Sequence, residues 1–294
     1  ALELYQKSAD LGNETGKGNL NNLKDKMAKN PNKTVDPNKT IEPVKSAGDK
    51  LKETPKNNVE QSVVVSPLEE LNSLVGLDSV KRDVQNTINL AQTQKMREEM
   101  GMKVIPTSKH LVFTGNPGTG KTTVARILAR FYKDMGILSK GHLVEVDRSD
   151  LVANYIGQTA TKTMEKVQEA YGGVLFIDEA YALASTSNTG NTYNAEAIAT
   201  LIQAMENHRD DLVVIFAGYT KEMQAFLDSN SGIVSRIGYT LEFEDYTEDE
   251  LVDIFKGMVK KAGFTVEDAA IEKLRTIINE YKDTKNFGNA RFVR

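Results

Sequence analysis

One short segment of the chain has residue types and spacing that suit the binding of phosphate groups. Gly115-Asn-Pro-Gly-Thr-Gly-Lys-Thr122 fits the pattern G-x-x-x-x-G-K-[ST] at every position. Glycines let a backbone wrap closely around phosphate oxygens, the lysine supplies a positive charge, and the threonine hydroxyl can hold Mg²⁺. The segment therefore predicts a nucleotide site in which the following helix presents its positive end to the phosphates. The residues expected to hold the nucleotide are Asn116, Pro117, Gly118, Thr119, Gly120, Lys121, Thr122 and Thr123.

A pair of carboxylates follows a second apolar segment. Residues 174–177 read Val-Leu-Phe-Ile and lead directly into Asp178 and Glu179. Because parallel strands end at the same edge of a sheet, we expect these carboxylates to lie beside the phosphates. Asp178 together with Thr122 then suits Mg²⁺, whereas Glu179 suits the orientation and deprotonation of an attacking water. A kinase needs no such hydrolytic base, so the pair indicates hydrolysis, with ATP and Mg²⁺ as cofactors.

These residues must be positioned by a sheet that is covered on both faces. The apolar runs at 174–177 and 212–217 are continuous rather than alternating, which is typical of parallel strands buried on both sides. Helical spacing occurs at 80–91 and again after the glycine-rich segment. We therefore predict a doubly wound parallel α/β sheet with helices on both faces. The five expected strands are 110–114, 143–146, 174–177, 212–217 and 240–243.

The composition excludes several other chemistries. The chain has 294 residues, with 37 Lys+Arg against 41 Asp+Glu, and contains no cysteine and three scattered histidines. The lack of cysteine excludes disulfides, thiolate zinc sites, iron–sulfur clusters and cysteine nucleophiles. Residues 1–67 carry a net charge of +2, so the acidity lies in the remainder and argues against nucleic acid as a partner. We expect a soluble cytoplasmic protein without membrane insertion, since neither a signal segment nor a run of 18 apolar residues occurs.

The first 67 residues differ from the rest of the chain. Five of the seven prolines fall between Pro31 and Pro67, among Lys, Asn and Thr, which predicts a flexible linker over residues 28–67. Residues 1–27 contain apolar side chains at helical spacing. This helical segment resembles the end of a Sel1-type repeat, although a short amphipathic helix without repeat neighbours would give the same pattern.

The residues around these motifs resemble those of the AAA+ ATPases and, among them, those of the CbxX/CfqX branch. That branch includes red-type rubisco activases, stage V sporulation protein K and ATPases associated with type VII secretion. The resemblance rests on Gly172–Tyr181, Asp150–Gly157 and Leu212–Tyr219. It implies an α/β nucleotide-binding domain over residues 68–246, followed by a small all-α lid over 247–294 that is truncated within a helix.

The resemblance also implies roles for residues outside the glycine-rich loop. Arg236 stands just before the last strand, where the family places an arginine finger that reaches the γ-phosphate of a neighbouring subunit. Arg291, in the sequence Gly-Asn-Ala-Arg, matches the second sensor of the lid. Gly76 and Leu77 match the segment that packs against adenine. A surface arginine, a helix cap and a helix-entry turn, respectively, are the alternatives for these positions.

The position of the first sensor departs from the commonest pattern of the family. Many AAA+ proteins have Asn there, whereas this chain reads Ala217-Gly-Tyr-Thr220. The CbxX/CfqX branch also has Gly-Tyr, so the departure is expected for the branch. The sequence does not decide between Tyr219 and Thr220 for this role.

A further loop matches the one that contacts the substrate in ring-forming members of the family. Tyr155, Ile156 and Gly157 follow the second strand, where an aromatic–aliphatic–glycine loop lines the axial channel. An exposed aromatic side chain there can contact any polypeptide, although Tyr155 packed under the next helix is the alternative. The polar residues 185–192 would form a second channel loop or a long surface loop.

We therefore predict an ATPase that forms a homo-oligomer, a hexamer, and remodels or threads a protein substrate through a central pore. One alternative is a nucleotide-gated binding or assembly module whose N-terminal repeats recognise the partner. Another is a DNA-linked AAA+ motor, which the acidic charge and the lack of a Lys/Arg stripe disfavour. The sequence identifies neither the protein partner nor the ring size.

Overall fold

A computed structural model describes five stretches of the chain, all of which belong to one unit, Ser62–Arg294. The described residues are 65–103, 107–155, 157–184, 191–284 and 287–294. The helical segment predicted at 1–27 and nearly all of the predicted linker lie outside them, as do Ile156 and most of the second channel loop. Within the described ranges, no helix has the combined length and hydropathy that a bilayer span requires.

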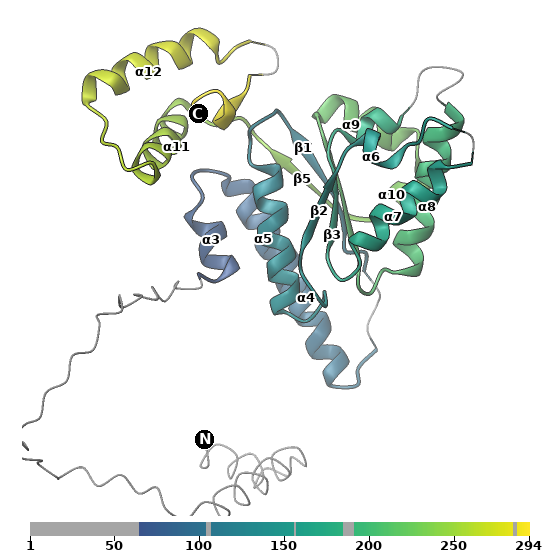
Figure 1. The fold of residues 1–294 in the computed structure, drawn as a ribbon. Helices are drawn as coiled ribbons and strands as arrows, with labels where there is room; N and C mark the ends of the chain where they lie inside the picture. The colour runs from purple at the N-terminus through teal and green to yellow at the C-terminus, as the bar shows by residue number, and fades with distance from the viewer. Residues whose placement is uncertain (1–64, 104–106, 156, 185–190, 285–286) are drawn as a thin grey trace, which may run out of the picture. The chain divides into compact units, whose positions relative to one another are not determined.

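Five parallel strands form the centre of this unit (Figure 1). Their order is β2-β3-β4-β1-β5, so β1 lies between two strands that come much later in the chain. The carboxyl ends of all five strands therefore meet at one edge of the sheet. This confirms the predicted five-stranded parallel α/β sheet. The strands are β1 His110–Gly115, β2 Leu143–Val146, β3 Val174–Ile177, β4 Val213–Gly218 and β5 Ile237–Phe243.

Alternate side chains of the strands point into two separate apolar layers. On one face Phe113 and Phe176 are buried with the apolar sides of three helices. These are α3 Pro67–Ser73, α4 Asp78–Glu99 and α5 Lys121–Asp134. On the other face Val112, Leu175 and Phe216 pack against the remaining helices of the α/β part. These are α6 Arg148–Leu151, α7 Thr159–Glu169, η1 Ala180–Leu183, α8 Asn191–Asn207, α9 Thr220–Asp228 and α10 Ser231–Val234.

The last strand is longer than the sequence pattern predicts. An apolar run marked only residues 240–243, whereas β5 begins at Ile237. This strand is at the edge of the sheet and pairs only with β1. Residues 238–240 are exposed, and only Leu241 and Phe243 of the strand are buried. An edge strand needs no continuous apolar run, so the hydrophobic pattern of the sequence predicts only the second half of β5.

Two helices and a short 3₁₀ turn form a separate layer after the sheet. They are α11 Glu248–Lys261, α12 Asp268–Tyr281 and η2 Asn289–Arg291. Leu251, Val252 and Ile278 are the centre of their own small apolar cluster. The predicted helical lid is therefore confirmed.

His110 is a buried polar residue at the start of β1. The backbone N–H of Val214 donates to its Nδ1 at 3.0 Å, and its Nε2 lies 3.1 Å from the carbonyl oxygen of Met205. Since Nδ1 accepts, Nε2 carries the proton, and the ring is neutral. Burial lowers the pKa of His110 to about 4, because the charged form would lose its hydration. In its neutral form the ring joins β1 to β4 and to the end of α8.

We predict that this ring makes the protein sensitive to mild acid. Between the ordinary pKa of 6.5 and about 4, the unfolded chain protonates His110 while the folded chain does not. The free energy of unfolding should therefore fall across this window, by at most about 3 kcal/mol from this group. Urea titrations from pH 7.5 to 4 should show a larger loss for the wild type than for His110→Asn, which keeps an acceptor but does not titrate. Parallel losses in the two proteins would contradict this role.

Candidate nucleotide site

The loop between β1 and α5 folds as a tight cradle of backbone. Gly115, Gly118 and Gly120 all have positive φ angles, of 144°, 75° and 96°. A Cβ on Gly115 would lie 2.2 Å from the carbonyl oxygen of Phe243, so only glycine lets the loop begin this close to β5. Because α5 begins at Lys121, the positive end of its dipole faces the loop. This arrangement suits the phosphate groups of a nucleotide.

The Lys121 ammonium is partly buried within this cradle. Its Nζ donates to the carbonyl oxygens of Gly115 and Asn116, each at 2.8 Å. No carboxylate of the described residues forms an ion pair with it. The pKa of Lys121 is lowered to about 8, mainly because burial disfavours the charged form. The charge of Asp178 opposes this lowering, and the charge of Arg291 contributes to it. A cation with neutral partners in a concave site is suited to an anionic ligand.

The two carboxylates lie where the parallel sheet places them. The backbone N–H of Asp178 donates to the carbonyl oxygen of Val146 at 2.8 Å, so the ladder between β2 and β3 continues to this residue. Glu179 has a left-handed φ of 48°, a conformation that non-glycine residues adopt at a cost, and the chain turns there into η1. Asp178 is half-buried and Glu179 is exposed, and both line the same pocket as Lys121.

A pocket of about 720 Å³ brings most of the predicted site residues together. Core and lid both contribute to its walls. Of the residues expected to hold the nucleotide, six line it: Pro117, Gly118, Gly120, Lys121, Thr122 and Thr123. Leu77, Asp178, Glu179 and Arg291 also line it. This volume is in the range of known small-molecule sites.

Three of the residues predicted to contact the nucleotide do not line the pocket. Asn116 turns its side-chain amide to the carboxylate of Asp245, at 2.8 and 3.0 Å. Thr119 is fully buried, and its hydroxyl donates to the carbonyl oxygen of Asn116. Gly76 has a left-handed φ of 58° and lies against the side chain of Glu250. These residues shape the loops around the pocket.

Sequence patterns missed several residues that line the pocket. One face of α11 contributes Ile254, Gly257 and Lys261, a spacing that helical periodicity could have revealed once the lid was placed over the site. Tyr246 follows the carboxyl end of β5, and its hydroxyl donates to the carbonyl oxygen of Thr119 at 3.2 Å. At the first-sensor position Tyr219 lines the pocket, whereas Thr220 does not.

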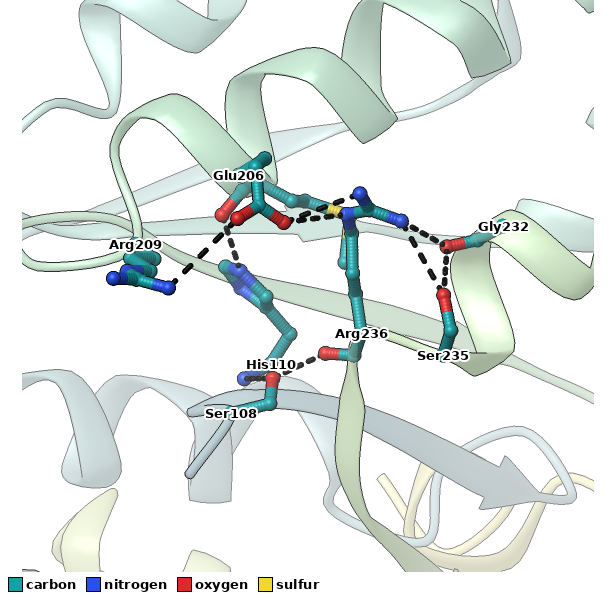
Figure 2. Close-up of polar contacts among 8 residues, drawn as sticks. Ser108, His110, Glu206, Arg209, Gly232, Ser235 and Arg236 are labelled. Atoms are coloured by element: carbon teal, nitrogen blue, oxygen red, sulfur yellow. Dashed lines mark hydrogen bonds and ion pairs between the residues drawn. The ribbon is translucent and has the colours of Figure 1, made fainter. Parts of the chain in front are cut away.

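Arg236 lies away from this pocket. It stands at the amino end of β5, next to the start of β1, whereas the nucleotide loop follows the carboxyl end of β1. Its Nε and Nη2 each lie 3.1 Å from one carboxylate oxygen of Glu206, and its Nη1 donates to the carbonyl oxygen of Gly232 at 3.0 Å (Figure 2). Glu206 also lies 3.8 Å from Arg209. The guanidinium side chain remains 29% exposed.

The predicted channel loop is also separate from the pocket. It joins α6 to α7, and its described residues include Tyr155 and Gly157. Tyr155 is 70% exposed, so it is not packed under the next helix. Gly157 has a φ of 78° with open space around it. Ile156 lies outside the described residues.

The chemistry of the pocket fits a divalent metal held together with a nucleotide. Within the described ranges, no cluster of three or more His, Asp or Glu side chains forms a metal cage. Mg²⁺ needs no such cage, because it commonly takes one or two protein oxygens together with phosphates and water. Thr122 and Asp178 are the oxygen-bearing side chains that would hold it.

Comparison with known proteins agrees with this geometry. Residues 111–244 match the family described as "ATPase family associated with various cellular activities (AAA)", and residues 247–294 match the AAA lid domain. The chain is 39% identical to stage V sporulation protein K of Bacillus subtilis (strain 168) over 242 residues, which are 81% of this chain and 74% of that protein.

A second relative is a chloroplast protein. The chain is 45% identical to the ribulose bisphosphate carboxylase/oxygenase activase of Cyanidioschyzon merolae (strain NIES-3377 / 10D) over 237 residues, 80% of this chain and 77% of that protein. In structure it is similar to the FIGL-1 AAA domain in complex with ADP, with a TM-score of 0.53, 18% identity, and coverage of 76% of this chain and 69% of that one. That structural likeness supports the fold alone. The relatives agree with the branch predicted from the sequence.

We predict that the Lys121 ammonium makes nucleotide capture fall at alkaline pH. The cation is lost as pH rises through its pKa of about 8, so kcat/KM for ATP should decrease above that pH. Bound phosphates stabilise the ammonium, so kcat should change less. The phosphates themselves titrate near pH ~6 and keep constant charge in this range. Initial rates from pH 7 to about 9.5 test this, with Lys121→Arg as the non-titrating control. A flat wild-type profile would contradict it.

Proposed function

The chain belongs to the AAA family of ATPases, in the branch of stage V sporulation protein K and the rubisco activases, and from this premise we propose a ring motor that acts on a protein. Six identical copies assemble around a central pore, and ATP hydrolysis with Mg²⁺ pulls a polypeptide partner through it. The relative from Cyanidioschyzon merolae is named as an activase of another enzyme, which supports a protein partner. The observation that carries this proposal is the position of Arg236 relative to its own nucleotide pocket.

Within one subunit, the pocket supplies the groups that hold the nucleotide. Lys121 and Arg291 contribute positive charge to the phosphates, and Thr122 and Asp178 hold the metal. Glu179 orients the attacking water and takes its proton. This assignment is supported by the presence of all five side chains in the wall of one pocket.

Tyr219 is our candidate for the first sensor. It lines the pocket beside Gly218, and its ring centroid lies 5.7 Å from that of Tyr181. Stacking of this kind holds the ring in one orientation, so its hydroxyl can serve as a fixed contact. Thr220 begins α9 and does not line the pocket.

Arg236 serves the nucleotide of a neighbouring subunit. A strand of the length of β5 extends roughly 20 Å, and Arg236 lies at the end of it that is remote from the glycine-rich loop. The side chain therefore cannot reach the phosphates of its own chain. In a head-to-tail ring the same arginine faces the next pocket, where it stabilises charge in the transition state and makes hydrolysis depend on assembly.

The loop with Tyr155 contacts the protein partner. The Tyr155 side chain is 70% exposed, so its ring is accessible to another polypeptide. A tyrosine ring offers apolar area and stacking to any polypeptide, without selecting a sequence. The positive φ of Gly157 and the open space around it suit a loop that moves between nucleotide states.

We predict that two inactive variants restore activity when they are mixed. Arg236→Ala should lower kcat by about a thousandfold without loss of ATP binding, because it removes transition-state charge. Glu179→Gln should likewise bind ATP but not hydrolyse it. In mixed rings, some pockets combine an intact Glu179 with an intact Arg236 from the neighbour. A 1:1 mixture should then recover about a quarter of wild-type turnover, as random assembly of head-to-tail subunits gives.

The mixing experiment has a matched control. Arg236→Ala mixed with the double variant Arg236→Ala/Glu179→Gln contains no intact Arg236 and should stay inactive. Recovery there, or normal turnover of Arg236→Ala alone, would remove the finger assignment. No recovery in the first mixture, with mixed rings confirmed by mass, would contradict action between subunits.

We predict that Tyr155→Ala separates hydrolysis from work on the partner. Basal ATPase activity should stay within about twofold, because the loop is apart from the pocket. Denatured casein, an unfolded polypeptide, should stimulate the wild-type ATPase but not this variant. Tyr155→Phe should retain the stimulation, since the ring rather than the hydroxyl makes the contact. Equal stimulation of the alanine variant and the wild type would contradict a channel role for Tyr155.

A further inference from the structure

The junction between core and lid contains a buried asparagine that the proposed function does not use. Asn289 opens η2, the turn that also contains Arg291. It is fully buried and has a left-handed φ of 47°. Asparagine tolerates this conformation better than most residues other than glycine. A buried polar side chain must have its hydrogen bonds supplied by its surroundings.

The side-chain amide of Asn289 has partners on both sides of the junction. Its Oδ1 accepts from the backbone N–H of Tyr246 at 3.0 Å. Its Nδ2 donates to Oδ1 of Asp245 at 2.8 Å and to the carbonyl oxygen of Phe287 at 3.2 Å. The carbonyl oxygen of Pro117, in the glycine-rich loop, is 3.4 Å from the same Nδ2. One amide therefore joins the lid, the end of the sheet and the phosphate loop.

Asp245 extends this connection to the phosphate loop by a second route. Asn116 donates to both of its carboxylate oxygens, and Asn289 donates to one of them. Hydrogen bonds to an ionised acceptor are stronger than those between neutral groups. Asp245 also lies close enough to Lys121 for its charge to oppose the lowering of the pKa of the ammonium. The carboxylate is thus shared by the loop that cradles the phosphates and by the lid.

The backbones of the two segments are also in direct contact. The N–H of Ala290 donates to the carbonyl oxygen of Gly118 at 3.2 Å. A Cβ on Gly118 would lie only 2.2 Å from the carbonyl oxygen of Gly288. The phosphate loop therefore cannot change shape at Gly118 without a shift of the lid segment that contains Arg291.

We propose that Asn289 and Asp245 form a latch that couples occupancy of the phosphate loop to the position of the lid and of Arg291. They are positioning residues, since they act through Asn116 and the backbone of residues 288–290. A displacement of residues 116–118 by phosphates is transmitted by the shared carboxylate to Asn289, which lies two positions before Arg291. This inference rests on the proposed role of Arg291 at the nucleotide.

The test measures the lid directly. The chain has no cysteine, so single cysteines placed at exposed Glu165 of α7 and Lys273 of α12 can be labelled for energy transfer. Mg²⁺ with a non-hydrolysable ATP analogue should shift the core-to-lid distance in the full-length protein. Asn289→Gly keeps the left-handed backbone but removes the amide, and should abolish at least half of this shift. KM for ATP should rise about tenfold, with a smaller change in kcat.

Matched control variants distinguish loss of the latch from a general loss of stability of the lid. Asn279→Ala removes a lid asparagine that donates to Glu248, away from the junction, and should leave the distance shift and KM unchanged. Asp245→Ala, at an exposed position, should reproduce the effect of Asn289→Gly, whereas the adjacent Glu244→Ala should not. Adding Asp245→Ala to Asn289→Gly should change KM by less than the product of the single effects, because both break one latch.

Each outcome decides a separate point. A normal distance shift in Asn289→Gly, or in Asp245→Ala where the glycine variant does not fold, would overturn the latch. Independent, multiplying effects of the two substitutions would also overturn it. If Arg291→Ala leaves KM unchanged while the latch variants still abolish the shift, the proposed role of Arg291 fails and the coupling of loop to lid stands.

Discussion

A partly buried ammonium, held by two carbonyl oxygens and contacted by no carboxylate of the described residues, is the constraint on which the rest of this structure depends. The cradle offers Lys121 two carbonyl oxygens, and the charges of Asp178 and Asp245 offset part of the desolvation that lowers its pKa. A carboxylate in contact with the ammonium would neutralise its charge and weaken its attraction for phosphate groups. The sheet, the start of α5 and the glycines are arranged so that this cation faces a pocket.

The length of the strands keeps the nucleotide pocket and Arg236 at opposite edges of the parallel sheet. Its carboxyl edge presents the nucleotide pocket, and its amino edge holds Arg236 in an ion pair with Glu206. Two apolar layers of buried side chains, one on each face, keep these edges at a fixed distance. On the proposal that Arg236 serves a neighbouring subunit, the two halves of one site lie at opposite edges of the sheet, and a head-to-tail ring of copies would bring them together.

The lid is attached by a few specific contacts rather than by a shared core. Its helices pack around Leu251 and Ile278, and Tyr246 contacts both this cluster and the core of the sheet. The side chain of Asn289 bonds to the backbone N–H of Tyr246 and to the carboxylate of the preceding Asp245. Through Tyr246 and the proposed latch, a small lid can follow the contents of the pocket while it remains attached to the phosphate loop.

The sequence by itself determined the parts of this protein whose signals are local. The glycine pattern, the Asp178–Glu179 pair after a buried run, and the covered strands depend on neighbours within a few residues, so spacing alone predicted them. The strand expected at 174–177 has those bounds in the structure, and the one expected at 212–217 is β4 Val213–Gly218, shifted by one residue. Family resemblance added Arg236 and Tyr155, whose roles remain proposals.

Only the tertiary structure decided where distant segments meet. It turned Asn116 away from the pocket toward Asp245, brought Tyr246 and one face of α11 into the walls of the pocket, and placed Asn289 against the carbonyl oxygen of Pro117. These pairs are more than a hundred residues apart in the chain. Periodicity reports which face of an element is apolar, but it cannot report which polar group from another element will complete a hydrogen bond.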